Sequence, residues 1–484
     1  MYSYSQFTKH VFGMGLLNLF SVVQGLVFLP IITKVLGAED YGIWSQLKIT
    51  MGILVPFALL GLQESLTRFI PATKDKKTMQ EGVCSSLVVA SGMTIFFSLI
   101  LLFFSGPAAS FLKFNQTFIR LLSAMIIFES LNAIILVVIQ AMREIKKYFW
   151  FTTLKMFGET GLVIGAIFLG CGLYGAILSL LVIRVIIFFI LFIFLIFKIG
   201  LKIPDFSLIK SYLRFGTPTL INNISYPVVT SADRYLIAFF LGIVFVGYYA
   251  PAYSLAMLLG FFLFPLASML SVILPKFFDE NDISQVKKYL RYSLKYYLLI
   301  IIPSVFGLSF LSKSLLSILS TEKIASASYL VVPLIAISVF LYGVSYFFNQ
   351  VLVLVKKTKL IAIIWVIAAI LNLGLNIIFI PIFGILAAAT VTLISYLCAF
   401  LLTWYFSMKE FKFEIDWWFV VKSFASSAVM AVFIIWFDPA GLLKTVITVI
   451  TSILIYTGLI LLFKGIDRRE IRFFKNMIFS DSKL

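Results

Sequence analysis

The chain has 484 residues, of which 62% are hydrophobic and 12% are charged, and its formal net charge at pH 7 is +18. A typical soluble domain carries about 25% charged residues, so this composition excludes a water-soluble globular fold. Apolar runs of about 20 residues recur along the sequence, the length that crosses a hydrocarbon core of about 30 Å. Backbone groups find no water there, so we expect helical crossings rather than the short alternating strands of an outer-membrane barrel.

The apolar runs predict an all-α integral membrane protein with about fourteen transmembrane helices. In chain order, these helices are expected at residues 10–36, 43–70, 83–105, 116–141, 148–170, 172–197, 211–240, 245–275, 289–312, 327–354, 358–381, 383–406, 416–437 and 441–464. The first run lacks a short apolar core followed by a small-residue cleavage site. We therefore expect it to remain as the first helix instead of being removed as a signal peptide.

The sequence repeats a set of landmarks at an offset of 203 to 210 residues. The pairs are Phe12-Gly13 with Phe215-Gly216, Leu36-Gly37 and Gly42 with Leu241-Gly242 and Gly247, the helix-ending Pro71 with Pro275, Gln140 and Lys146-Lys147 with Gln350 and Lys356-Lys357, and Tyr174-Gly175 with Phe383-Gly384. Five pairs in one order indicate an internal duplication, which is how many secondary transporters are built. We predict two parallel six-helix lobes at 1–200 and 205–408, an additional helix pair at 414–466 and a basic cytoplasmic tail at 467–484.

The basic residues are distributed as the positive-inside rule requires. If the first helix starts in the cytoplasm, thirty of the 39 Lys and Arg residues fall in cytoplasmic segments and seven in outer segments. The remaining two, Arg184 and Arg234, fall inside helices. This bias predicts that both termini are cytoplasmic, and it attributes the positive charge to topology and anionic lipids instead of nucleic acid.

Ionisable side chains within the predicted helices are candidate site residues, because charges inside a bilayer are costly and usually functional. They are Glu64, Arg68, Glu129, Glu159, Arg184, Asp233 and Arg234. Glu64 and Arg68 are four residues apart, so a local ion pair is an equal alternative for them. Asp233 and Arg234 are adjacent and point about 100° apart, so we expect other helices to neutralise them, with Glu129 or Glu64 as partner of Arg234.

Three Arg and four carboxylates among these residues predict a hydrated chamber for a polar, anionic substrate. Arg keeps its charge when buried and binds phosphate through two donors, so phosphate or diphosphate is the expected ligand. Uncharged polar residues accompany them, namely Asn18 and Gln24 in the first helix and Asn222 and Asn223 in the seventh. Lining the chamber and hydrogen bonding between helices are equal alternatives for these four. No cofactor or metal site is expected, and the choice of H⁺ or Na⁺ as coupling ion stays open.

Three segments resemble proteins of one membrane family. They are Leu29–Gln46 (LPIITKVLGAEDYGIWSQ), Ser231–Gly242 (SADRYLIAFFLG) and Leu371–Ala389 (LNLGLNIIFIPIFGILAAA). They are similar to polysaccharide transporters of the MOP flippase superfamily, and among these to the Wzx-type O-antigen and capsule flippases. The resemblance covers the whole chain, and Asp233 and Arg234 match its helix 7 motif.

This resemblance implies two six-helix lobes around a central cavity that alternate access between the two sides. It implies flipping of undecaprenyl-diphosphate-linked oligosaccharide from the inner to the outer leaflet of the bacterial cytoplasmic (inner) membrane. The implied partners are this lipid-linked substrate, membrane lipids and the polysaccharide polymerase or chain-length machinery.

Other functions are compatible with parts of this pattern. A MATE-type multidrug or cation antiporter would favour a cavity dominated by carboxylates and aromatics, and a lipid II flippase would share the fold. A membrane polymerase or ligase of glycans would need a large outer loop, and none is predicted. The sequence also has no HExxH, GxSxG or nucleotide-binding motif, so we expect a transporter and not an enzyme.

Overall fold

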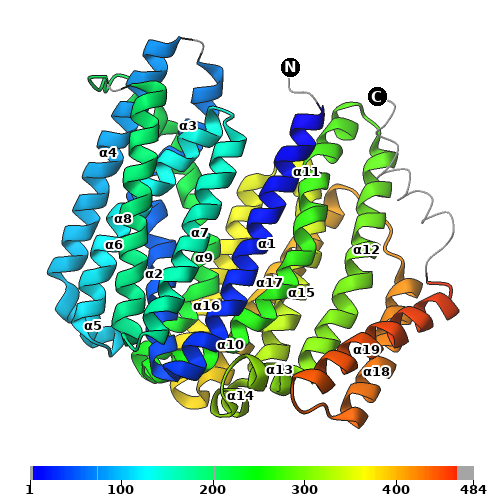
Figure 1. Ribbon diagram of the computed structural model, residues 1–484. Helices are drawn as coiled ribbons and strands as arrows, with labels where there is room; N and C mark the ends of the chain where they lie inside the picture. The colour runs from blue at the N-terminus through cyan, green and yellow to red at the C-terminus, as the bar shows by residue number, and fades with distance from the viewer. Residues whose placement is uncertain (1–3, 74, 201, 466–484) are drawn as a thin grey trace. The chain divides into compact units, whose positions relative to one another are not determined.

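A computed structural model of the chain describes residues 4–73, 75–200 and 202–465, with the side chains of these residues except 4–12, 14 and 219–229. Within the described residues all regular secondary structure is helical, which confirms the all-α prediction (Figure 1). Twelve helical segments in this part of the chain are long and apolar enough to cross a membrane, or thirteen if the bent pair α2 and α3 counts as one span. The chain is a multi-pass membrane protein.

Eleven helical elements begin before residue 250 in the described part of the chain. They are α1 (Tyr4–Val35), α2 (Ala38–Ala58), α3 (Leu62–Phe69), the 3₁₀ helix η1 (Ile70–Ala72), α4 (Lys76–Phe103), α5 (Ser105–Leu112), α6 (Gln116–Ala141), α7 (Ile145–Phe168), α8 (Gly172–Ile199), α9 (Ile209–Phe240) and α10 (Ile243–Met257). The later elements are the 3₁₀ helix η2 (Leu258–Phe262), α11 (Leu263–Asp279), α12 (Ile283–Phe310), α13 (Ser312–Leu319), α14 (Glu322–Ser328), α15 (Val331–Leu354), α16 (Thr358–Phe383), α17 (Ile385–Glu410), α18 (Trp417–Phe437) and α19 (Leu442–Leu462).

Each of the fourteen predicted ranges falls on one or more of these helices. The range 211–240 corresponds to α9. The side chains of residues 219–229 in this helix are not among those that the structure describes. The short helices α5, α13 and α14 were not predicted, because segments of seven or eight residues carry no span-length apolar signal.

Two predicted helices are interrupted in the structure. Residues 43–70 form α2 and α3, bent by 57° where Leu60 and Gly61 adopt left-handed backbone conformations at φ 52° and 73°. Residues 245–275 form α10, η2 and α11. The expectation that Pro275 ends a helix is wrong, since α11 continues through it to Asp279, and Pro is tolerated in membrane helices whose neighbours satisfy the backbone.

The chain divides into two compact units. The first comprises residues 1–250, 319–321 and 376–384, and the second comprises residues 251–318, 322–375 and 385–484. The predicted lobes and helix pair follow the duplication instead, and they stay a prediction. The predicted tail at 467–484 lies outside the described residues.

The first unit has an aliphatic core between α3, α6 and α8. Leu62 and Leu66 of α3 are fully buried with Ile135 and Ile139 of α6 and Ile187 of α8. α9 packs along α2 and α3, and the hydroxyl of Ser65 on α3 donates to the carbonyl of Tyr212 on α9 at 2.6 Å. These contacts explain why α9 belongs to the first unit.

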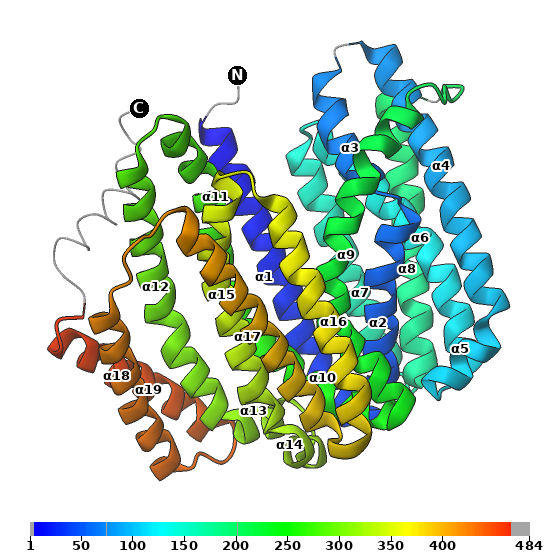
Figure 2. The ribbon, with the colours of Figure 1, turned by 180° about the vertical axis from the view of Figure 1, so that it is seen from behind.

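In the second unit, α18 and α19 pack on each other and on α12 (Figures 1 and 2). The Tyr456 hydroxyl on α19 donates to the carbonyl of Leu299 on α12 at 2.9 Å and lies 2.8 Å from the Ser423 hydroxyl on α18. One phenol thus links three helices of the second unit by hydrogen bonds.

Candidate functional site

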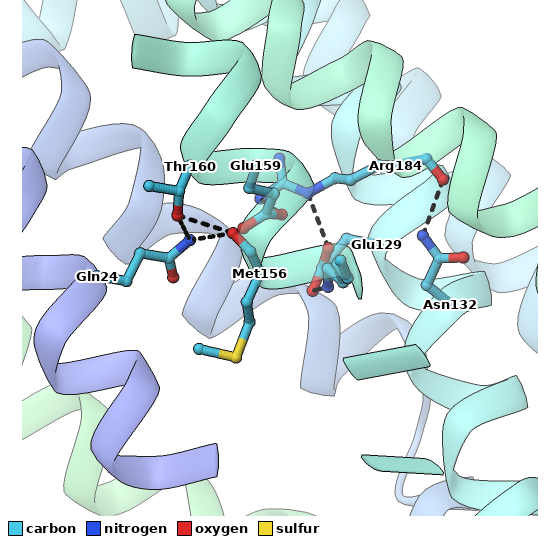
Figure 3. A network of polar contacts seen from close by, with 8 residues as sticks. Gln24, Glu129, Asn132, Met156, Glu159, Thr160 and Arg184 are labelled. Atoms are coloured by element: carbon cyan, nitrogen blue, oxygen red, sulfur yellow. Dashed lines mark hydrogen bonds and ion pairs between the residues drawn. The ribbon is translucent and has the colours of Figure 1, made fainter. Parts of the chain in front are cut away.

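Three neighbouring helices of the first unit bring four charged side chains together. Both oxygens of Glu129 on α6 are engaged: Lys155 Nζ lies 2.6 Å from Oε1, and Arg184 Nε lies 2.8 Å from Oε2. A second guanidinium nitrogen of Arg184 lies 3.3 Å from Glu159 Oε1. We call Glu129, Lys155, Glu159 and Arg184 the ion cluster (Figure 3).

Local sequence spacing and backbone contacts position this ion cluster. Lys155 and Glu159 are four residues apart on α7, so both project from one face of that helix. Asn132, one turn after Glu129 on α6, donates to the carbonyl of Arg184 at 2.9 Å and fixes α8 beside α6. The cluster is therefore held by its helices as well as by its charges (Figure 3).

The first helix contacts α7 next to the ion cluster. Gln24 on α1 donates from Nε2 to the carbonyl of Met156 at 3.1 Å and to the hydroxyl of Thr160 at 3.0 Å. These residues follow Lys155 and Glu159 directly in the sequence, so Gln24 fixes α1 against the turn that carries both charges (Figure 3). These contacts are hydrogen bonds between helices, and a chamber-lining role for Gln24 stays a prediction.

The side chains of the ion cluster are buried to different extents. The Arg184 side chain is 3% exposed, whereas Lys155 and Glu129 are 14% and 21% exposed. One terminal nitrogen of Arg184, NH1, is buried and has no hydrogen-bond partner among the described residues. A buried charge of this kind is costly unless it is paired. The Arg184 guanidinium is thus the most buried group of the cluster, and its NH1 nitrogen makes no hydrogen bond among the described residues. Glu129 and Lys155 form the more accessible edge.

Lys48 on α2 adds a third cation to this region. Its ammonium lies 5.4 Å from the ring centre of Phe28 and 5.6 Å from that of Trp44. The side chain is exposed although Lys48 is the eleventh residue of α2, about 15 Å along the helix. Counted with the ion cluster, Lys48 gives this part of the first unit three basic and two acidic side chains, a formal excess of one positive charge.

A second group of predicted site residues lies on α9 and α10. Asp233 and Arg234 are both buried. Asp233 accepts from the Tyr249 hydroxyl at 2.6 Å and from the amide of Arg234 at 2.8 Å. Arg234 donates to the carbonyl of Thr230 at 2.8 Å and lies over the Tyr249 ring. The Asp233 carboxylate thus accepts a hydrogen bond from a phenol of the next helix, a partner that the sequence did not suggest.

The other candidates are spread over the first unit. Glu64 and Arg68 lie on the exposed side of α3, and the Arg68 guanidinium stacks on Phe215 at 4.5 Å. Asn18 is exposed on α1. The side chains of Asn222 and Asn223 lie outside the described residues.

Sequence reasoning missed Lys48 and Lys155 as site residues. Both were counted as cations of segments outside the membrane, Lys48 on the outer side and Lys155 on the cytoplasmic side. Each is the eleventh residue of a helix, Lys48 of α2 and Lys155 of α7. The spacing of Lys155 and Glu159 on an apolar helix was the available signal.

Chemically, this arrangement suits recognition of an anion. Lysine and arginine donors can share a phosphate-type ligand, and the two carboxylates offset part of the positive charge when no ligand is bound.

Comparison with known proteins gives the family. A model of the polysaccharide biosynthesis protein family matches residues 7–281, and a MatE family model matches residues 218–378. A curated relative from Haloferax volcanii, described as a probable low-salt glycan biosynthesis flippase, Agl15, is 26% identical over 284 residues, which are 58% of this chain and 59% of the relative. The chain therefore aligns with about three fifths of that relative's length.

Solved structures agree on the fold. The chain is similar to the lipid II flippase MurJ in an inward closed conformation, with a TM-score of 0.75 and 18% identity over 96% of this chain and 99% of the other. It is also similar to an inward-facing multidrug resistance MATE transporter of the MOP superfamily, with a TM-score of 0.65 and 15% identity over 81% and 94% of the two chains. With a family match over more than half of its length, the chain belongs to the polysaccharide biosynthesis protein family and has the fold of the MOP superfamily.

Proposed function

We propose that this protein is a flippase that moves an undecaprenyl-diphosphate-linked oligosaccharide from the inner to the outer leaflet of a bacterial cytoplasmic membrane. The observation that carries the proposal is the partly accessible, cation-rich region of Lys48 and the ion cluster in a member of the polysaccharide biosynthesis family. The diphosphate is the charged part of such a substrate, and it requires cationic donors inside the bilayer region.

In this proposal, Lys48 and Lys155 make the first contacts with the diphosphate, because they are the accessible cations of the region. Arg184 lies deeper and contributes its remaining donor from NH1. Arg234, with Asp233, is a second candidate contact on α9. The sugars would interact with polar side chains, Asn18 among them, and the polyprenyl tail would remain in lipid.

Transport, rather than catalysis, is the activity that the relatives' names support. The excess of cations favours an anionic substrate over the cations and drugs of a multidrug antiporter. A lipid II flippase would carry a related diphosphate, so only the cellular consequence of its loss separates it from the leading proposal.

Gene deletion with complementation tests this function. Cells lacking the protein are expected to lose surface polysaccharide and to accumulate the lipid-linked oligosaccharide, and the parental gene should restore export. Arg184→Ala and Arg234→Ala should fail to restore it although the proteins are inserted in the membrane. Normal polysaccharide with both variants would refute the anion site. Altered drug sensitivity with intact polysaccharide would indicate an antiporter, and lethality of the deletion would indicate lipid II.

A further inference from the structure

The linker between α17 and α18 is anchored to other helices of the second unit (Figure 2). Residues 411–416 form no helix or strand. The Phe413 ring is buried, and its centre lies 5.2 Å from that of Phe348 on α15. We call residues 405–422, which comprise this linker, the end of α17 and the start of α18, the linker segment.

The acidic residues of the linker segment are all paired with cations from outside it. The pairs are Glu410 with Lys357, Glu414 with Arg291 and Asp416 with Lys295. The ammonium groups of Lys357 and Lys295 lie 2.7 and 3.0 Å from their carboxylate oxygens. The negative charges of the segment are therefore offset within the second unit.

The basic residues of the linker segment have no such partners. Lys409, Lys412 and Lys422 form no ion pair among the described residues, and Lys409 and Lys412 are exposed. The Lys409 ammonium lies 4.3 Å from the ring centre of Tyr405. Because the three acids are already paired, these lysines remain as uncompensated positive charge. A signal for membrane topology alone would not require this division.

Exposed aromatic rings accompany the lysines. Tyr405, Trp417 and Trp418 are 53%, 65% and 72% exposed. Tyr405 precedes Lys409 by four residues on α17, and Trp418 precedes Lys422 by four on α18, so each of these lysines shares a helix face with a ring. Trp and Tyr are enriched at headgroup level in bilayers, and lysine side chains reach from there toward water. The pattern is that of a segment at headgroup level, on the side predicted to be cytoplasmic.

We infer that the linker segment is a binding site for the headgroup of an anionic phospholipid. The three lysines bind the phosphate oxygens, and the exposed rings lie beside the acyl chains nearest the headgroup. Basic residues next to transmembrane helices attract anionic headgroups, and each Lys or Arg raises the affinity by about fivefold. A zwitterionic phospholipid has no net charge to attract them. The site contains no residue of the ion cluster, and the inference does not depend on the transported substrate.

A phospholipid titration of the purified chain tests this site. The probe is phosphatidylglycerol, added in a neutral detergent and counted on the protein by native mass spectrometry, with phosphatidylcholine as the zwitterionic comparison. The parent is expected to bind phosphatidylglycerol at least about tenfold more tightly than phosphatidylcholine. The triple variant Lys409→Gln/Lys412→Gln/Lys422→Gln should lose at least about tenfold in phosphatidylglycerol affinity, because three attractive charges are removed.

The matched control removes the same charge from exposed lysines of the second unit that lie outside the linker segment. This variant is Lys313→Gln/Lys323→Gln/Lys444→Gln, and it should bind phosphatidylglycerol like the parent. An equal loss in both triple variants would show a general attraction between charges and would overturn the site. Undiminished binding by the first triple variant would overturn it as well.

A single substitution should change the affinity in the opposite direction. Glu414→Gln releases Arg291 from an exposed ion pair and so adds one uncompensated cation beside the lysines. Phosphatidylglycerol affinity should therefore rise severalfold. An unchanged or lower affinity would contradict a site in which paired acids leave the lysines free for lipid.

Inorganic phosphate separates a lipid site from a site for free phosphate. Millimolar inorganic phosphate should leave phosphatidylglycerol bound, and displacement would assign the lysines to free phosphate and overturn the inference. The titration contains no lipid-linked oligosaccharide. Its failure would thus leave the proposed function standing, and a protein that binds phosphatidylglycerol but flips nothing would reject only the proposed function.

Discussion

The ion cluster of the first unit and its equivalent in the second unit use opposite chemistry. At an offset of 210 residues, Lys155 corresponds to Trp365 and Asn132 corresponds to Tyr342. In the second unit, Trp365 on α16 makes edge-to-face contacts with Tyr342 on α15 and Tyr396 on α17, at centroid distances of 5.7 and 5.8 Å. Three helices are thus joined by charges in one copy and by aromatic rings in the other.

This difference indicates what the charges are for. Aromatic contacts join α15, α16 and α17 without placing an ion in the membrane. A buried ion cluster is costly to desolvate and is weak evidence for stability, since apolar replacements are often as stable. The second unit joins its equivalent helices without such ions, which supports the proposal that Glu129 and Arg184 serve a ligand.

The largest effect is expected from Arg184→Ala. It leaves Glu129 and Glu159 without their shared cation and should lower the free energy of unfolding by about 3–5 kcal/mol. Thermal unfolding of the purified protein measures this. Adding Glu159→Gln to Arg184→Ala should recover part of the loss, because the carboxylate that loses its ion pair is then neutral while Glu129 keeps Lys155 as its partner. No recovery would show that packing, and not charge, holds the three helices.

A smaller effect is expected in the second unit from Trp365→Leu. Two aromatic pairs are lost, each worth about 0.5–1.5 kcal/mol beyond area burial. The variant should unfold at a lower temperature, to an extent that does not depend on salt, and it should still support polysaccharide export. Loss of export by a stably folded Trp365→Leu protein would show that the aromatic contacts of α15, α16 and α17 also serve transport. The contrast between the two units would then be wrong.

The next largest effect on stability is expected from Asp416, which caps the start of α18 in the second unit and pairs with Lys295. Burial raises the pKa of the Asp416 carboxyl, but the amide of Phe419 and the ammonium of Lys295, at 3.0 Å, together lower the pKa below its usual value. The resulting stabilisation is present above about pH 4 and is lost as pH falls through the lowered pKa. Asp416→Ala should cost ~1 kcal/mol at neutral pH.

The control for this contact is Asp416→Asn, which keeps a capping oxygen but cannot ionise. Its unfolding should depend less on pH below about pH 4 than that of the parent. An identical acid dependence in both proteins would exclude Asp416 as the titrating group.

The smallest effect on stability is expected from Lys48→Gln. The side chain is exposed and forms none of the ion pairs of the cluster, so unfolding should change by no more than about 0.5 kcal/mol. Export should nevertheless fall, because the variant removes the excess positive charge. A stable variant with normal export would remove Lys48 from the site.

The fold was largely predictable from the sequence, and the pairing within the site was not. Apolar runs of span length gave the helices, since hydrophobic length is a local property. The break at Leu60 and Gly61 was missed because the run stays apolar through it. The partner of Glu129 depends on how α6, α7 and α8 rotate against each other. Residue spacing therefore could not show that Glu129 pairs with Lys155 and Arg184 and not with Arg234.

The most direct test of the central claim is a flipping assay in proteoliposomes that contain a fluorescent undecaprenyl-diphosphate oligosaccharide. We predict that the parent exposes the labelled sugar to an outside quencher. Lys48→Gln should slow this at least about tenfold, the effect of one lost charge-assisted contact. The matched control Lys444→Gln, an exposed lysine near the start of α19, should flip at the parental rate. Equal rates for Lys48→Gln and Lys444→Gln, or no flipping by the parent, would contradict the account.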